Sequence, residues 1–143
     1  MTVRALAPKA NTCVLHAFEY LGFKLEQKSS ASYSGYFTAK ERKIYLKNFS
    51  GTVIYHELGH FLAWISGSRD KTAEFKAIYE KEKSKMTSAN RVYNTQNSSE
   101  YFAESYREFC INPNGLKKQR PQTYNAIKAA VDCLNNKSDS YLY

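Results

Sequence analysis

Residues 53–64, VIYHELGHFLAW, constrain the fold and chemistry of this chain more than any other segment. Apolar side chains fall on more than one side of the segment, Thr52 is a plausible N-cap, and Gly67 follows, so the pattern predicts a largely buried helix. His56 and His60 stand four residues apart. On a helix this spacing turns two side chains to the same face with Cβ atoms about 5 to 6 Å apart, so both imidazoles can bind one ion.

The residues between and after the two histidines indicate which ion and which chemistry. Catalytic zinc sites use three protein ligands and a water, and Glu57, rotated by about 100° from His56, can reach the water as a general base. Gly59 indicates close packing, because glycine inside a helix costs about 1 kcal/mol relative to alanine. The alternative is a buried helix with two hydrogen-bonded histidines, but the combined pattern favours one zinc ion per chain. Ala63 and Ser66 replace the glycine and histidine of the metzincin continuation, which excludes that subclass.

The third ligand is left open by the residues alone. It is either His16, the remaining histidine, or an acidic side chain. Glu100, Glu104 and Glu108 follow one another at i,i+4 spacing in SSEYFAESYREF, where like charges repel by a few tenths of a kcal/mol unless a cation neutralises them. On spacing alone, two other interpretations of this row of glutamates are as good as a metal site. Glu100 can be the N3 residue of a capping box with Asn97, and the whole row can be a solvated stripe.

Hydrophobic periodicity predicts an α+β fold, mostly helical with one small β-sheet, as a single domain over residues 1–143. A chain of 143 residues with 43% hydrophobic side chains can bury a core of its own. The predicted helices cover 8–21, 53–65, 70–85, 98–111 and a last segment from Pro121, a β-hairpin or two adjacent strands cover 32–49, and a loop covers 87–99.

Charge and hydropathy restrict the partners and the location. The net charge of +8 favours anionic partners, but the mixed signs over 70–85 indicate a solvated face rather than a nucleic-acid surface. Lys117, Lys118 and Arg120 could contact phosphate, yet they lack interleaved aromatic residues, so nucleic acid is not expected as a partner. No run approaches the roughly 20 apolar residues of a membrane span. The chain as written is expected in the cytoplasm, and a leader removed before numbering would make it secreted.

A family resemblance adds to these observations. From HELGH through FKAIYEKE, MTS and EYFAESYREF to TYNAI, roughly residues 50–135, the chain resembles the catalytic domain of anthrax lethal factor and its relatives, including the secreted Pro-Pro endopeptidases. These are zinc metallopeptidases of the zincin class. The resemblance implies that His56, His60 and Glu100 bind zinc and that Glu57 activates the water.

The same resemblance implies roles for two further residues. Tyr93 stands seven residues before Glu100, where the family has a tyrosine that stabilises the developing oxyanion. Glu104 matches a glutamate that supports the metal ligands without binding the metal itself. Residues 1–50 match only loosely, so neither the cell entry nor the substrate of the toxin is implied.

The predicted function is hydrolysis of peptide bonds by a zinc-dependent endopeptidase, in which Glu57 is the base and Tyr93 a donor to the oxyanion. A peptide or protein substrate is expected to add as a strand along YSGYFT, with Gly35 and Tyr36 as its contacts. One alternative is an intracellular regulatory protease of a mobile element that cleaves a repressor. Another is a catalytically dead, zinc-containing basic binding module. The presence of Glu57 favours the enzyme over the binding module, because a structural zinc site needs no base.

Overall fold

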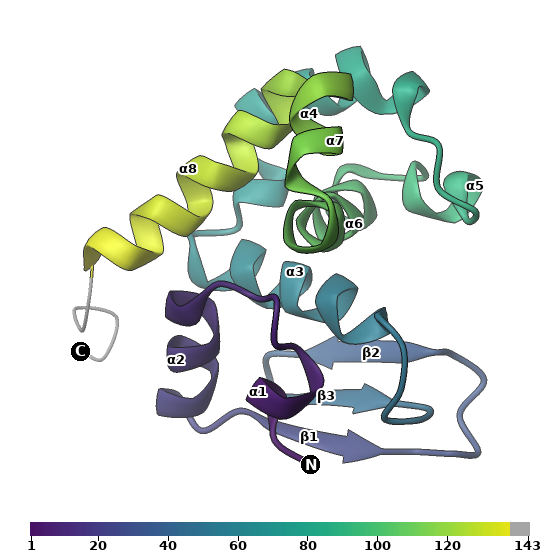
Figure 1. The fold of residues 1–143 in the computed structure, drawn as a ribbon, viewed down its shortest axis with the longest axis vertical. Coiled ribbons are helices and arrows are strands. Elements are labelled where there is room, and N and C mark those ends of the chain that lie inside the picture. Colours follow the sequence, from purple (N-terminus) through teal and green to yellow (C-terminus); the bar gives the residue numbers. More distant parts are fainter. Residues whose placement is uncertain (138–143) are drawn as a thin grey trace.

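A small mixed sheet lies at one end of the molecule in the computed structural model, which describes residues 1–137 (Figure 1). Its strands are β1 (Lys24–Gln27), β2 (Gly35–Thr38) and β3 (Lys43–Leu46), in the order β1-β3-β2. β2 and β3 pair in an antiparallel manner, as the predicted hairpin requires, whereas β1 pairs with β3 in parallel. β1 was not predicted, because KLEQ carries little β-branched or aromatic character, and its pairing with β3 creates the strand.

Helices make up most of the rest, so the fold is α+β and mostly helical, as predicted. α3 covers one face of the sheet, α6 packs on the other side of α3, and α4, α7 and α8 lie beyond α6 (Figure 1). The bounds are α1 (Val3–Leu6), α2 (Thr12–Tyr20), α3 (Val53–Ile65), α4 (Ala73–Glu82), α5 (Arg91–Asn94), α6 (Ser98–Ile111), α7 (Pro113–Gln119) and α8 (Pro121–Lys137).

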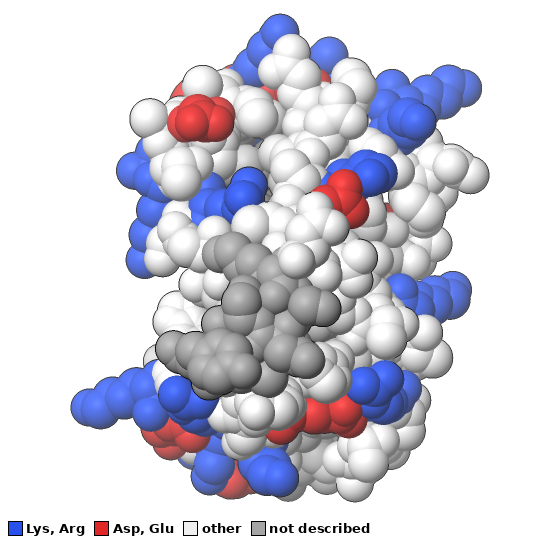
Figure 2. Space-filling view, turned by 90° about the vertical axis from the view of Figure 1, so that its left-hand side faces the viewer, with Lys and Arg blue, Asp and Glu red and all other residues white. Residues whose placement is uncertain are grey.

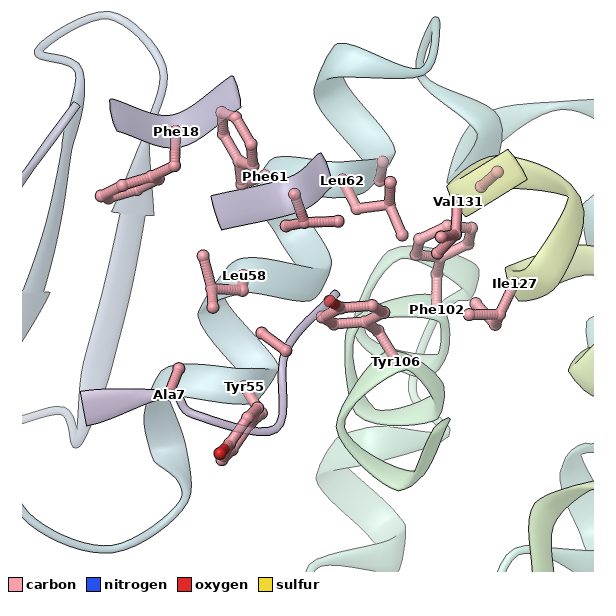
Figure 3. Close-up of a cluster of buried hydrophobic side chains, with 14 of the residues drawn as sticks. Ala7, Phe18, Tyr55, Leu58, Phe61, Leu62, Phe102, Tyr106, Ile127 and Val131 are labelled. Atoms are coloured by element: carbon pink, nitrogen blue, oxygen red, sulfur yellow. The ribbon is translucent and has the colours of Figure 1, made fainter. Parts of the chain in front are cut away.

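The predicted burial of α3 is confirmed. Leu58, Phe61 and Leu62 are fully buried and project from different sides of the helix (Figure 3). α3 begins directly after Thr52, but the Thr52 side chain makes no capping hydrogen bond. Packing on several sides therefore stabilises this helix more than its N-cap does. The side chains that surround it come from four other segments: Ala7, Phe18, Phe102, Tyr106, Ile127 and Val131.

The predicted helix over 8–21 starts too early. α2 begins at Thr12, after a turn over residues 7–10 that separates it from α1. Long-range hydrogen bonds hold this turn in place. Asn11 exchanges two of them with the Tyr106 hydroxyl, and the backbone N–H of Lys9 donates to the Tyr55 hydroxyl. The helical periodicity of the sequence extends into this turn. The tertiary contacts nevertheless hold residues 7–10 in the turn, so α2 starts only at Thr12.

The predicted helix over 70–85 is interrupted. Thr72 is extended and accepts a hydrogen bond from the Phe75 backbone N–H, so α4 starts at Ala73, and single turns of 3₁₀ helix cover Arg69–Lys71 and Lys83–Lys85. The predicted break after Ile111 is also only partial. The Asn112 side chain accepts from the Gly115 backbone N–H and begins α7, which the sequence reading missed.

Charged side chains are spread over the surface rather than gathered in one place on the face shown in Figure 2. One of the three basic residues that could have contacted phosphate is not available at the surface. Arg120 is fully buried, pairs with Glu108 and hydrogen-bonds to Ser105, so it cannot meet a ligand at the surface. Among residues 1–137, no helix combines the length and the apolar character that crossing a membrane requires.

Candidate metal centre

The centre forms where α3 and α6 cross at very short range. A Cβ atom added to Gly59 would lie 2.6 Å from both the Cα and the carbonyl oxygen of Ala103. The two helices can approach this closely only because residue 59 is a glycine. Gly59 therefore has the packing role that its position in the helix predicted, and the sequence carried no signal for its partner Ala103.

Close approach of the helices brings three polar side chains together. The Glu100 carboxylate oxygen Oε1 lies 2.9 Å from His56 Nε2 and 3.2 Å from His60 Nε2. One donor atom from each residue falls within 4.8 Å of the others, and no other group of this kind occurs in the part of the chain that the structure describes. His16 lies on α2 outside this group. Of the candidate third ligands, Glu100 is the one that lies against both histidines.

The three glutamates of α6 make different contacts, although Glu100 and Glu104 share His56 as a partner. Glu100 faces both histidines, the Glu104 carboxylate lies 3.0 Å from His56 Nδ1, and Glu108 pairs with Arg120. Glu104 is only 5% exposed. The solvated-stripe interpretation is therefore wrong, because Glu104 is buried, Glu100 is partly buried and hydrogen-bonded to both histidines, and Glu108 is neutralised by Arg120.

The capping interpretation of Asn97 is correct for the backbone of Glu100. The Asn97 side chain accepts a hydrogen bond of 2.8 Å from the Glu100 N–H and starts α6. The Glu100 carboxylate is directed at the histidines. Helix capping and the side-chain cluster thus use different atoms of one residue and reinforce each other, since the cap fixes the turn from which the carboxylate projects.

Mutual hydrogen bonding perturbs the ionisation of the cluster. Burial opposes a charged imidazole, but hydrogen bonds to Glu100 and Glu104 outweigh it and raise the pKa of His56 to about 9. Burial likewise opposes a charged carboxylate, yet hydrogen bonds from both histidines hold the pKa of Glu100 well below its usual range. Without an ion, the positive charge of His56 and the negative charge of Glu100 stabilise each other.

Glu57 lies beside this cluster in a more enclosed position. Its side chain is 6% exposed, and a Cβ atom added to Gly35 would lie 2.9 Å from its Oε2 atom. Burial raises the pKa of the Glu57 carboxyl, while the nearby charges of His56 and His60 lower it. A carboxyl group whose pKa is raised by burial beside a potential metal site has the properties of a general base.

Tyr93 reaches the cluster from the segment 87–99, which was predicted to contain no regular structure. That prediction is wrong, because the segment contains a single helical turn, α5. The Arg91 guanidinium donates to the carbonyl oxygens of Met86 and Ser84, and the Tyr79 hydroxyl donates to that of Thr95, so tertiary contacts fasten this turn.

The ring of Tyr93 lies 6.4 Å from that of His56, and its side chain remains 54% exposed. Partial burial, followed by the charge of Glu100, raises the pKa of its hydroxyl, so the hydroxyl stays protonated and able to donate a hydrogen bond. Nothing in the local sequence separates Tyr93 from the other tyrosines, because α5 brings it to the site only through distant contacts.

The two residues predicted to contact substrate occupy different sides of β2. Gly35 faces α3, and the side chain of Glu57 occupies the space beside its Cα atom. Tyr36 is 51% exposed and its ring stacks with that of Tyr45 across the opposite face of the sheet. β2 is an edge strand, so its outer backbone edge has no strand partner in the described residues. Contact with substrate at these two positions stays a prediction.

The donor set fits zinc. Two imidazole nitrogens and one carboxylate oxygen are preferred zinc donors, and tetrahedral bonds of about 2.0 to 2.2 Å separate donor atoms by roughly 3.3 to 3.5 Å. The observed separations of 2.9 and 3.2 Å between donor atoms require only a small expansion to meet this geometry. Glu104 engages His56 Nδ1, which leaves Nε2 directed toward the centre of the group.

Comparison with known proteins identifies one family. The family model described as anthrax toxin lethal factor, N- and C-terminal domain, matches residues 29–130. No curated protein matches the chain. The matched range contains the whole candidate site: Gly35, His56, Glu57, His60, Tyr93, Glu100 and Glu104.

Proposed function

The chain belongs to the anthrax toxin lethal factor family, and from that premise we propose that it is a zinc-dependent endopeptidase. The observation that supports this proposal most is the convergence of His56, His60 and Glu100 on one point, with the buried carboxyl group of Glu57 beside them. A purely structural zinc site has four protein ligands and no need of a base, whereas this group has three. One coordination position is thus left for water or substrate.

A zinc ion held by these three residues supplies Lewis-acid polarisation of a carbonyl group and makes a water molecule more acidic. Glu57 accepts the proton of the attacking water and delivers it to the leaving amine. Its burial raises its pKa and so strengthens it as a base. The protonated hydroxyl of Tyr93 donates a hydrogen bond to the oxygen of the scissile carbonyl as negative charge develops there.

The substrate in this proposal is an extended peptide. The outer edge of β2 offers unpaired backbone groups, and addition of a strand to such an edge gives main-chain hydrogen bonds that hold a peptide of many sequences. Gly35 and Tyr36 lie at the start of this edge, next to the N-terminal end of α3. A peptide bound there passes close to Glu57.

We expect one zinc ion per chain, because the described residues contain a single group of three suitable donors. Elemental analysis after dialysis measures the stoichiometry. His60→Ala is expected to lose the metal, since it removes one of the three donors. His16→Ala, the matched control from outside the group, is expected to keep it. Well under one equivalent in folded protein, or loss of zinc in the His16 variant, would contradict the assignment.

Replacing Tyr93 with phenylalanine is expected to lower kcat while zinc affinity and KM stay nearly unchanged. The hydroxyl acts mainly on charge that exists in the transition state, and loss of one such donor costs on the order of 10² to 10³ in rate. Steady-state kinetics on a peptide substrate gives the comparison. Tyr20→Phe is the matched control, because Tyr20 is about as exposed but lies on α2, outside the group. An unchanged kcat in the Tyr93 variant would leave this tyrosine a structural role only.

A further inference from the structure

Gly35 is a glycine for reasons of space rather than backbone conformation. The glycines of the chain with positive φ are Gly22, Gly51 and Gly67, so the backbone at Gly35 would accept an L-residue. The space around its Cα would not. An added Cβ atom would lie 2.8 Å from Val53 Cγ1 and 2.9 Å from both Cγ and Oε2 of Glu57. The side chain of Glu57 occupies the volume that any side chain at position 35 would need.

A second residue of β2 also holds Glu57. The backbone N–H of Phe37 hydrogen-bonds to the Glu57 carboxylate, and this bond contributes to lowering its pKa. The Phe37 ring packs against those of Phe23 and Phe61 at centroid distances of 6.0 and 6.2 Å, which anchors this part of the strand to the core. The start of β2 therefore confines the Glu57 side chain sterically and also donates a hydrogen bond to it.

We propose that strand β2 positions the catalytic base, with Gly35 as a positioning residue that leaves room for the Glu57 carboxylate beside the metal group. The assignment of Glu57 as base rests on the proposed function, whereas the contact between the two residues does not. A glutamate side chain loses rotamer freedom when it is confined. Confinement by β2 keeps the carboxylate within reach of the histidine-glutamate group before any substrate arrives.

The nature of the contacted atoms decides what a methyl group at position 35 would do. At Gly35 the neighbours are side-chain atoms, which can move, so Gly35→Ala is expected to displace the carboxylate rather than unfold the protein. At Gly59 the neighbours are backbone atoms of Ala103, which can move only if α6 moves. Gly35 therefore controls the position of the base, and Gly59 the spacing of the metal-binding helices.

The kinetic test compares Gly35→Ala with Ser34→Ala, a change at the neighbouring exposed position. We expect Gly35→Ala to lower kcat on the order of 10²-fold, the effect of misplacing a reacting group by about 1 Å, while KM and zinc affinity stay within about twofold. Ser34→Ala should leave all three quantities unchanged. An unchanged kcat in Gly35→Ala, or a loss of zinc that accounts for the lost activity, would overturn the proposal.

A double-mutant cycle on stability tests the same contact without any assay of activity. We expect Gly35→Ala to lower the midpoint of urea unfolding of the metal-free protein. The same substitution should lower it less when Glu57 is already alanine, because the clash with Glu57 is then absent. Equal shifts in the two backgrounds would overturn the coupling of Gly35 to Glu57. A coupled cycle in a protein that hydrolyses no peptide would contradict only the proposed function.

Discussion

Glu57→Gln is expected to abolish peptide hydrolysis while the protein keeps its fold and its zinc. Glutamine has nearly the same shape as glutamate, so it fills the enclosed space beside Gly35 and still accepts a hydrogen bond from the Phe37 backbone. It cannot take a proton from water. Loss of a general base typically lowers the rate by about 10² to 10⁴.

The measurement is turnover of a peptide library by the zinc-loaded wild-type and variant proteins, with cleavage sites identified by mass spectrometry. Zinc content and the thermal unfolding midpoint of both proteins serve as controls. Near-native turnover by the variant would refute Glu57 as the base. Absence of cleavage by the wild type, at full zinc occupancy, would instead favour the zinc-containing binding module.

Glu100→Ala is expected to weaken zinc binding far more than Glu104→Ala does. One carboxylate oxygen of Glu100 lies close to the Nε2 atoms of both histidines. In the proposed site, its removal deletes a direct ligand and a negative charge. Glu104 hydrogen-bonds to His56 Nδ1, on the side of the ring away from Glu100, and also pairs with Arg107, so it orients the His56 ring. Loss of such an orienting partner typically costs about 10- to 100-fold in metal affinity or activity.

Titration of both variants with a competing chelator compares the two roles on one scale. The variants are well matched, because the two glutamates lie one helical turn apart on α6 and both contact His56. The reverse order of affinities would place Glu104 on the metal and leave Glu100 as a helix-capping residue with Asn97.

Local sequence signals predicted those elements whose stabilising contacts are themselves local. α6 was predicted at Ser98–Ile111 and is observed there, because Asn97 caps its first turn and Asn112 stops it within the same segment. The β2–β3 hairpin was predicted from its strand-forming residues and its short polar connection. β1, α5 and the late start of α2 at Thr12 could not be predicted, since hydrogen bonds to residues distant in the sequence create them.

The candidate site divides in the same way. The sequence by itself placed His56 and His60 on one face of a buried helix and Glu57 beside them, because the period of the α-helix determines these relations within a single turn. It left His16 and the acidic side chains as alternatives for the third ligand. Their distance from α3 depends on how whole helices pack, and that packing is decided by side-chain volume at the crossing, where Gly59 meets the backbone of Ala103.

The positions of Tyr93 and Gly35 were likewise decided only by the tertiary structure. Tyr93 reaches the cluster because Arg91 binds the nearby Met86 carbonyl group and because Tyr79, on α4, binds the Thr95 carbonyl group at the end of α5. Gly35 faces Glu57 because the pairing of β2 with β3 sets which side of the strand meets α3. Periodicity and capping act over about four residues, whereas the packing that completes this site joins residues from 22 apart (Gly35 and Glu57) to 48 apart (His56 and Glu104) in the sequence. Its contacts therefore follow from the shapes of both partners together.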